Sequence, residues 1–177
     1  PIAAVTDSGK ALLYRGGPLK ADYDYFEKRI AMLDRLLVRV EETDKAALKQ
    51  ERRRLYEKRK RRREQVFANL AKHMAEEFKK HSVNVVFIGY PKEIARNKAG
   101  KENTNLWSYR KLIQRLAVTF ENHGIAVFAV DEYLSSKKCA WHDCEVERRP
   151  RGLIKCPKGH TMHSDLNNAM NHVKKGL

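Results

Sequence analysis

Metal-ligating side chains concentrate in one short part of the chain, between residues 139 and 163. Six candidates lie there: Cys139, His142, Cys144, Cys156, His160 and His163. Structural zinc sites use four tetrahedral nitrogen or sulfur ligands, commonly delivered as two close pairs. An odd number of cysteines interspersed with histidines favours a metal site over a disulfide framework. The segment therefore predicts a bound Zn²⁺ ion; the alternative is that the cysteines are ordinary buried thiols and the histidines face solvent.

Spacing favours four of these six residues as the ligands. Two residues separate Cys139 from His142, and three separate Cys156 from His160. The stretch between the two pairs would form the hairpin of a zinc ribbon. Cys144 is a substitute ligand and His163 is a spare, so the choice among the six stays open.

Carboxylates stand at the ends of the segments that we expect to be strands, and one opens the last helix. They are Glu93, Asp131, Glu132 and Asp165. In an open α/β sheet, reacting groups lie beyond the carboxyl ends of the strands. Converging carboxylates that hold two divalent ions cut phosphodiester bonds. Asp165 directly follows the cysteine- and histidine-rich segment, and its alternative role is to cap its helix.

The chain carries a large excess of positive charge. Its 177 residues include 37 Lys and Arg against 22 Asp and Glu, a net charge of +15, which favours a polyanionic partner. Much of the excess lies between Asp44 and His81. Eight residues there are expected to contact nucleic-acid phosphates: Arg52, Arg53, Lys58, Arg59, Lys60, Arg61, Arg62 and Arg63. Six of them are consecutive, wrap a helix on all sides and cannot serve a core; the alternative is a solvated helix with i,i+4 ion pairs to nearby glutamates.

Hydrophobic periodicity predicts an α/β fold. A β-hairpin is expected at 2–6 and 11–15, a long helical hairpin at about 18–81, and a buried central strand at 83–91. A helix at 106–124, closed by Gly124, and a strand at 125–132 complete a parallel βαβ unit. Periodicity is lost from Tyr133 to Ser164 and returns in a final helix.

The sequence also gives expectations about location and completeness. It has no apolar run of 18 residues and no basic segment followed by an apolar signal, so we expect a cytoplasmic protein with no membrane partner. The first residue is Pro1 and the chain starts abruptly as a strand. We therefore expect a fragment that lacks a preceding segment.

The combination of these motifs resembles the TnpB family of insertion-sequence nucleases. The approach "SSKKC" and the run "CPKGHTMHSDLNNAMNHV" carry the resemblance at the carboxyl end, where Asp165, Asn167, Ala169 and Asn171 match the family's Asp-x-Asn-x-Ala-x-Asn. The segment "RGGPLKADYDYFEKRIAMLDRLL" resembles the start of the family's helical hairpin. The resemblance thus covers essentially the whole chain.

This resemblance implies an RNase H-like, RuvC-like mixed sheet with an inserted zinc ribbon. The nuclease core would span 1–132, the ribbon 133–164 and the final core helix 165–177. It also implies cleavage of DNA with Mg²⁺, directed by a guide RNA, in the prokaryotic cytoplasm at the nucleoid.

The family's catalytic residues carry over only in part. Asp165 matches the last carboxylate, whereas the first precedes the segment present here. Gly89 and Tyr90 stand where the second, a glutamate, is expected, and Glu93 is the nearest replacement. In the ribbon, His142 replaces a cysteine and Gly159-His160 replaces Cys-Gly; zinc accepts two cysteines with two histidines.

Three functions follow as hypotheses. The first is the nuclease domain of an RNA-guided DNA endonuclease, whose activity needs the intact protein. The second is a nuclease-derived module that binds DNA or RNA without cleaving it. The third is a zinc-stabilised scaffold with no role in nucleic-acid binding.

Overall fold

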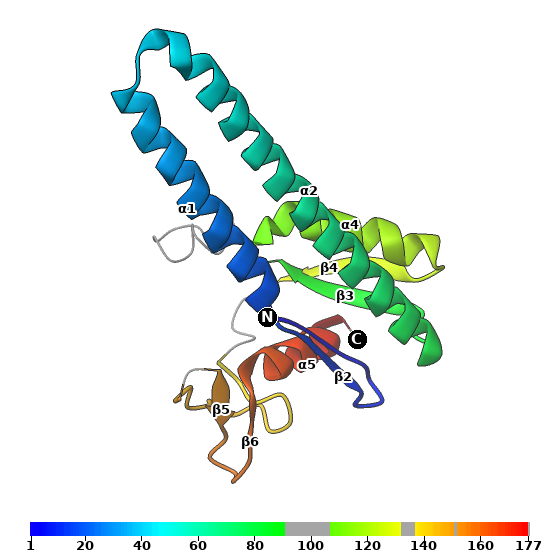
Figure 1. Cartoon of the computed structure of the whole chain (residues 1–177). Helices are drawn as coiled ribbons and strands as arrows, with labels where there is room; N and C mark the ends of the chain where they lie inside the picture. The colour runs from blue at the N-terminus through cyan, green and yellow to red at the C-terminus, as the bar shows by residue number, and fades with distance from the viewer. Residues whose placement is uncertain (91–106, 132–136, 151, 177) are drawn as a thin grey trace.

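The computed structural model describes residues 1–90, 107–131, 137–150 and 152–176. In chain order its elements are β1 (Ile2–Val5), β2 (Ala11–Tyr14), α1 (Gly17–Arg39), α2 (Glu42–Lys80), β3 (Val85–Tyr90), α4 (Tyr109–Asn122), β4 (Ala126–Asp131), β5 (Leu153–Lys155), β6 (Thr161–His163) and α5 (Ser164–Gly176). Figure 1 shows a long helical hairpin that projects from a body of short strands and helices.

The chain begins with the antiparallel hairpin that its sequence predicts. β1 and β2 pair in a register that sets Ile2 opposite Tyr14. Gly9 closes the turn with a φ of +86°, a left-handed conformation that glycine adopts without a Cβ clash. Alternate residues of the two strands pack against the main core: Ile2, Ala4, Leu12 and Tyr14.

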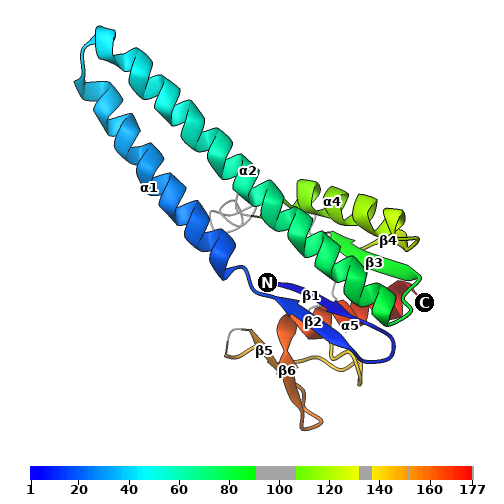
Figure 2. The same cartoon turned by 45° about the vertical axis from the view of Figure 1, so that its right-hand side comes forward.

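Helices α1 and α2 form the predicted helical hairpin, and Figure 2 shows the two helices side by side. The first helix begins at Gly17, with proline in its first turn, where the missing N–H costs no hydrogen bond. The apolar contact between the two helices is small. It consists of Phe26, Ile30 and Leu55, with Leu33 packed at its edge.

The second half of α2 belongs to the main core. Its buried residues follow helical spacing: Phe67, Ala71, Met74, Ala75 and Phe78. The ring of Phe78 lies 5.2 Å from the ring of Phe120 on α4, measured between centroids. Burying each such side chain contributes about 1.5–3 kcal/mol, so this contact fixes the base of the hairpin to the body.

Strand β3, helix α4 and strand β4 form the predicted parallel βαβ unit. The register runs from Val85 opposite Ala126 to Tyr90 opposite Asp131. Gly124 follows the end of α4 with a φ of +74° and turns the chain toward β4.

The expectation of a buried central strand at 83–91 is wrong in the described structure. There β3 pairs only with β4, and Val85 is 44% exposed. Val86 and Ile88 pack against the main core, whereas Phe87 and Gly89 face α5. An apolar run indicates that a strand is partly buried, but it does not indicate whether the strand has a neighbour on one side or on both.

In the described part of the chain, six strands pair as three separate two-stranded sheets, β1–β2, β3–β4 and β5–β6. Strand pairing among the described residues therefore does not join the first two sheets into the single mixed sheet that we expected. Helix α5 packs against β1, β3 and β4, and so connects these two sheets. A cavity of about 570 Å³ lies between β1 and β3 and is also lined by α2, α4 and α5.

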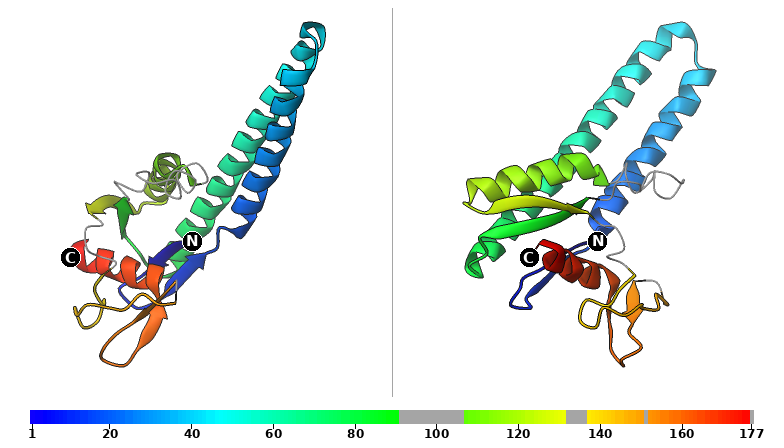
Figure 3. Two further views of the ribbon diagram at one scale, coloured as in Figure 1. Left: turned by 90° about the vertical axis from the view of Figure 1, so that its left-hand side faces the viewer. Right: turned by 180° about the vertical axis from the view of Figure 1, so that it is seen from behind.

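The third sheet leads directly into α5. Strand β6 ends at His163 and α5 begins at the next residue. Figure 3 shows from two sides how the orange strand continues into the red helix. None of the described helices is both long and apolar enough to cross a membrane.

Candidate metal centre and nucleic-acid interface

Four of the six candidate ligands converge around β5 and β6. The ligand atoms of Cys139, His142, Cys156 and His160 all lie within 4.8 Å of one another. We call these four residues the Cys/His cluster. They are the four that sequence spacing favours, and they come from two separate turns of the chain.

Each pair of the Cys/His cluster is shaped by its own tight turn. The backbone N–H of Cys139 donates to the carbonyl of Cys144 at 2.8 Å, which closes the first turn around the first pair. In the second turn the N–H of Cys156 donates to the carbonyl of His160 at 2.9 Å, and Gly159 adopts a φ of +95°. Each turn therefore positions the two ligands of its own pair through local backbone hydrogen bonds.

Interatomic distances in the cluster suit a zinc ion. The Sγ of Cys139 lies 3.3 Å from Nε2 of His160, and Nδ1 of His142 lies 3.3 Å from Sγ of Cys156. Zinc bound at about 2.3 Å to sulfur and about 2.1 Å to nitrogen in a tetrahedron separates such atoms by about 3.6 Å. Both cysteines are buried, where thiolates need a cation. The donor set and its spacing therefore fit Zn²⁺.

Of the two remaining candidates, Cys144 lies beside the Cys/His cluster and His163 points away from it. Cys144 places its Sγ 3.5 Å from Sγ of Cys156, so it remains the substitute ligand. His163 turns to the start of α5 instead. Its Nδ1 accepts a hydrogen bond from the N–H of Asp165 at 3.2 Å and lies 3.6 Å from an oxygen of the same residue's carboxylate.

Asp165 lies in the first turn of α5, and its side chain is 41% exposed. Along α5, Gly176 packs by Phe87 of β3, and His172 packs by Gly89. The helix thus runs antiparallel to β3. Its first turn, with Asp165, consequently lies toward the carboxyl ends of the parallel strands, the edge where α/β proteins place reacting groups.

The wall of the cavity beside Asp165 contains polar groups that the sequence did not single out. Asn168 and His172 line it, and both are on α5. The Oδ1 atom of Asn168 and the Nε2 atom of His172 are buried and find no hydrogen-bond partner among the described residues. Burial, with a smaller contribution from Lys175, lowers the pKa of His172 below its ordinary value. The imidazole is therefore held in its neutral form.

Described carboxylates do not complete a magnesium site. Asp165 and Asp7 both line the cavity, but Asp7 follows β1 and belongs to the turn before β2. Glu93 and Glu132 lie outside the described residues, as does the side chain of Asp131. A two-metal site needs several converging carboxylates, so Asp165 does not form one with the described residues alone.

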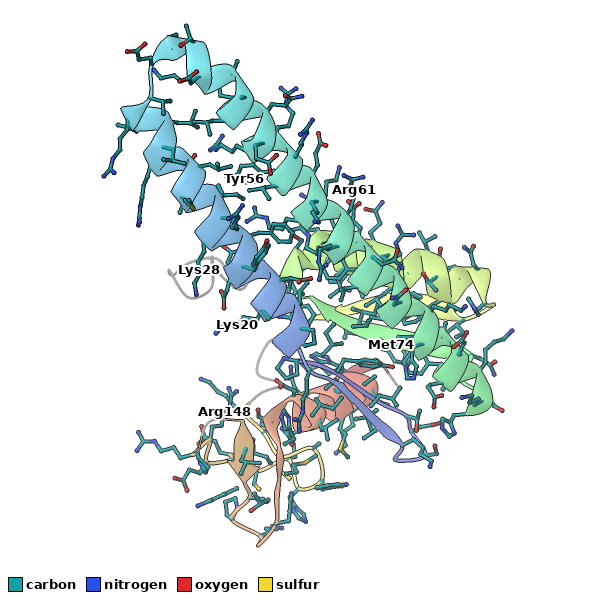
Figure 4. The ribbon with its side chains drawn as sticks, in the orientation of Figure 1. Lys20, Lys28, Tyr56, Arg61, Met74 and Arg148 are labelled. Atoms are coloured by element: carbon teal, nitrogen blue, oxygen red, sulfur yellow. The ribbon has the colours of Figure 1, made fainter. Side chains whose placement is uncertain are left out.

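The eight basic residues of α2 divide into three groups. Arg53, Lys58, Lys60 and Arg61 are exposed, and we call them the outer basic set. Figure 4 shows Arg61 projecting from α2 on the side away from α1. Three others form ion pairs with acidic residues of α1: Arg52 with Asp34, Arg59 with Glu27 and Arg62 with Asp22. Arg63 is partly buried, and burial and the neighbouring charge of Arg59 lower its pKa.

These ion pairs hold the two helices of the hairpin together. Arg62 donates two hydrogen bonds to the carboxylate of Asp22, at 2.8 and 2.7 Å, and the hydrogen bond to this carboxylate raises the pKa of the guanidinium. Arg59 also lies over the ring of Tyr56, 5.1 Å from its centroid. The sequence predicts that these basic side chains contact phosphates, with a solvated helix paired to nearby glutamates as the alternative. Neither hypothesis includes ion pairs with acidic residues of α1.

Sequence reasoning missed the acidic partners on α1 and the buried polar residues of α5. Asp34 and Glu27 are seven residues apart, as are Arg52 and Arg59, which is the repeat of two packed helices. Complementary charge at this spacing is a signal that the sequence offers.

Comparison with known proteins identifies related chains. The family model described as probable transposase, OrfB of the IS605 type, matches residues 2–95, and the model of the Cas12f1-like TNB domain matches residues 109–172. A TnpB-like protein, ORF457, of Acidianus two-tailed virus is 40% identical over 179 residues, which cover 99% of this chain and 39% of that protein. The chain thus spans about two fifths of the length of the curated relative it matches.

Two solved structures share its fold. One is a complex of Cas12f1 with single-guide RNA and target DNA, with a TM-score of 0.73 and 20% identity, covering 98% of this chain and 46% of that one. The other is a CRISPR–Cas12f ternary complex, with a TM-score of 0.76 and 18% identity, covering 96% and 35%.

Proposed function

Because the chain belongs to the TnpB family of OrfB-type probable transposases, we propose that it forms the RuvC-like nuclease part of a transposon-encoded, RNA-guided DNA endonuclease. The observation that carries this proposal is the position of Asp165. It lies toward the carboxyl ends of β3 and β4, in the helix that directly follows the Cys/His cluster. This is the placement that α/β enzymes use for their reacting groups.

The proposed fold is RNase H-like, with β1–β2 and β3–β4 as parts of one mixed sheet. Support comes from α5, which packs against strands of both pairs, and from the fold shared with Cas12f structures. The proposed units are the core with its helical hairpin at 1–132, the ribbon at 133–164 and the final helix at 165–177. In this scheme Zn²⁺ held by the Cys/His cluster has a structural role.

Catalysis would require more than the described residues. In nucleases of this kind, magnesium ions activate water and stabilise the leaving oxygen. Asp165 would be one ligand, and Glu93 is the proposed second. Without further carboxylates, the 177-residue chain is expected to bind Mg²⁺ poorly and not to cleave DNA.

Nucleic-acid binding is assigned to the outer basic set of α2. These side chains are exposed on a helix that extends beyond the body (Figure 4). They suit phosphate contacts, which are independent of base sequence. The solved complexes of similar fold contain single-guide RNA and target DNA, which supports guide RNA and DNA as the proposed partners.

Cleavage by the full-length gene product, with guide RNA and Mg²⁺, tests the nuclease proposal. Asp165→Ala should lower the rate about a hundredfold or more, because it removes a metal-binding carboxylate. Asp7→Ala is the matched control, since Asp7 lines the same cavity from the turn between β1 and β2 and should leave the rate unchanged. Equal rates for Asp165→Ala and the wild type would overturn the assignment.

Binding is tested separately on the 177-residue chain with a DNA duplex at several salt concentrations. Changing the outer basic set to glutamine should reduce the slope of log K against log salt by about 0.9 for each lost phosphate contact. Changing four dispersed exposed lysines instead, Lys10, Lys28, Lys79 and Lys158, gives the same net charge and should reduce the slope less. Equal reductions would show that net charge, and not the outer basic set, determines binding.

A second function has one specific observation in its favour. Gly89 stands where the family resemblance places a glutamate, and the imidazole of His172 fills the space in which its side chain would begin. This favours a module that binds nucleic acid and has lost catalysis. Salt-sensitive binding by the full-length gene product without any Mg²⁺-dependent cleavage would select this alternative.

A further inference from the structure

A buried asparagine on α5 binds the backbone on both sides of a metal ligand. The Oδ1 atom of Asn167 accepts a hydrogen bond from the N–H of Ala140 at 2.9 Å, and its Nδ2 donates to the carbonyl of Lys138 at 2.8 Å. These two residues flank Cys139, the first cysteine of the Cys/His cluster. Asn167 is fully buried, as are Cys139 and Ala140.

A second asparagine, one turn further along α5, strengthens the same contact. The Nδ2 of Asn171 donates to the carbonyl of Lys138 at 2.9 Å. This carbonyl therefore accepts hydrogen bonds from both asparagines. We call Asn167 and Asn171 the asparagine bracket.

The asparagine bracket and Asp165 occupy different faces of one helix. Asp165, Asn168 and His172 line the cavity, at the spacing of one helical stripe. Asn167 and Asn171, four residues apart, face the ribbon backbone instead. Because a helix turns as a unit, the contact that fixes one face also fixes the direction of the other.

The ribbon thus holds α5 at two places. Strand β6 continues into the helix without a loop, and the N–H of Ser164 donates to the carbonyl of Gly152 at 2.9 Å. The asparagine bracket holds the second and third turns. Truncating both asparagines would remove the hydrogen bonds that their side chains make with the N–H of Ala140 and the carbonyl of Lys138. Leaving such buried backbone groups without these partners costs free energy.

From this geometry we propose that the asparagine bracket couples metal binding at the Cys/His cluster to the orientation of α5, and so positions Asp165. Metal binding would hold the turn that contains Cys139 in place. This turn carries the N–H of Ala140 and the carbonyl of Lys138, and their hydrogen bonds with Asn167 would in turn hold α5 in its orientation. Asn167 and Asn171 are positioning residues, which touch neither metal nor substrate. The consequence for Asp165 rests on the proposed nuclease function, whereas the coupling between metal and helix does not.

Hydrogen exchange of the 177-residue chain, followed by mass spectrometry over α5, measures this coupling. Removing zinc with a chelator should raise the exchange rate of α5 amides about tenfold in the wild type, although α5 contributes no ligand to the cluster. In Asn167→Ala at saturating zinc, α5 should already exchange at the fast rate, and chelation should add little. Thermodynamic reciprocity requires that zinc affinity also falls by a similar factor.

Asn168→Ala is the matched control. Asn168 lies next to Asn167 in the sequence but lines the cavity, and its Oδ1 atom has no hydrogen-bond partner among the described residues. This variant should keep the wild-type response to zinc. Cobalt substitution, read by its thiolate charge-transfer absorption, checks that the cluster in each variant still binds metal with its cysteines.

The coupling is overturned if α5 of the wild type exchanges equally with and without zinc, or if Asn167→Ala retains the full response. Should Asn167→Ala fail to fold, Asn171→Ala decides, because it removes the hydrogen bond from Asn171 to Lys138 and leaves the two of Asn167. It should reduce the response partially; an unchanged response would then contradict the proposal. Failure of the Asp165→Ala cleavage test would remove the nuclease function without altering any of these exchange results.

Discussion

Gly89 and His172 form a contact that admits no larger side chain. A Cβ atom added at Gly89 would overlap the imidazole of His172, which is buried and packed between α5 and β3. Gly89→Ala should therefore destabilise the chain by about 1–3 kcal/mol, the usual cost of overpacking a core, measured by urea unfolding. Gly17→Ala is the control, because nothing lies within 4 Å of that position, and it should be near neutral. Equal stability of the Gly89→Ala variant and the wild type would contradict the packing described.

His172 should also make stability depend on pH. Burial lowers its pKa in the folded state below the ordinary value of 6.5, so the unfolded chain binds the proton more readily. The stability that this residue contributes is present above about pH 6.5 and is lost as pH falls through the lower, folded-state pKa. His172→Gln should lose less stability between about pH 7.5 and 5.5 than the wild type. A difference in stability between the two chains that stays constant with pH would refute the prediction.

At the scale of the elements, the helical hairpin combines a small apolar contact with charge pairs. Leu55 is the only buried hydrophobic residue in the first half of α2 as described, and ion pairs lie on either side of it. The α1–α2 interface therefore depends on arginine side chains that the sequence assigns to phosphate contacts. The described ion pairs between α2 and α1 use Arg52, Arg59 and Arg62, and none of them uses the outer basic set.

A double-mutant cycle on Arg59 and Glu27 measures this contribution. Removing both side chains singly and together should give a coupling of about 0.5–1 kcal/mol, because both groups are partly exposed to solvent. The coupling should shrink in about 1 M salt, where the Debye length is about 3 Å. Lys58→Ala, one residue away and exposed, should change stability by less than about 0.5 kcal/mol. A coupling of zero would show that the ion pair between Arg59 and Glu27 does not stabilise the hairpin.

At the scale of the whole molecule, the ribbon and the body depend on different forces. The cluster holds β5 and β6 through ligands, whereas α2, α4 and the sheets β1–β2 and β3–β4 share an apolar core. Loss of metal should therefore unfold the ribbon and loosen α5 while the helical hairpin persists.

Chelation of zinc tests this division. The ring of Trp141 lies 4.7 Å from that of His160, centroid to centroid, so its fluorescence should change when the metal leaves. The helical circular dichroism signal should fall only slightly, since α1 and α2 supply most of the described helix. Cys139→Ser should behave like the chelated wild type, and Trp141→Phe should abolish the fluorescence response. Collapse of the entire helical signal on chelation would show that the core depends on the metal.

The sequence alone determined the features that depend on residues close together in the chain. Helices and strands follow from local periodicity, and the four residues of the Cys/His cluster follow from pairs that each fit one turn. Asp165 was found because it directly follows the ribbon segment.

Only the tertiary structure decided which surfaces meet. It turned Arg52, Arg59 and Arg62 toward α1, left β3 half exposed, set His172 against Gly89 and joined Asn167 to the backbone beside Cys139. Each of these contacts joins residues that are distant in sequence. A short stretch of sequence therefore shows the chemical type of one partner and not which residue it will contact. The identity of the other partner is fixed when the chain buries its apolar surface and must satisfy the polar groups buried with it.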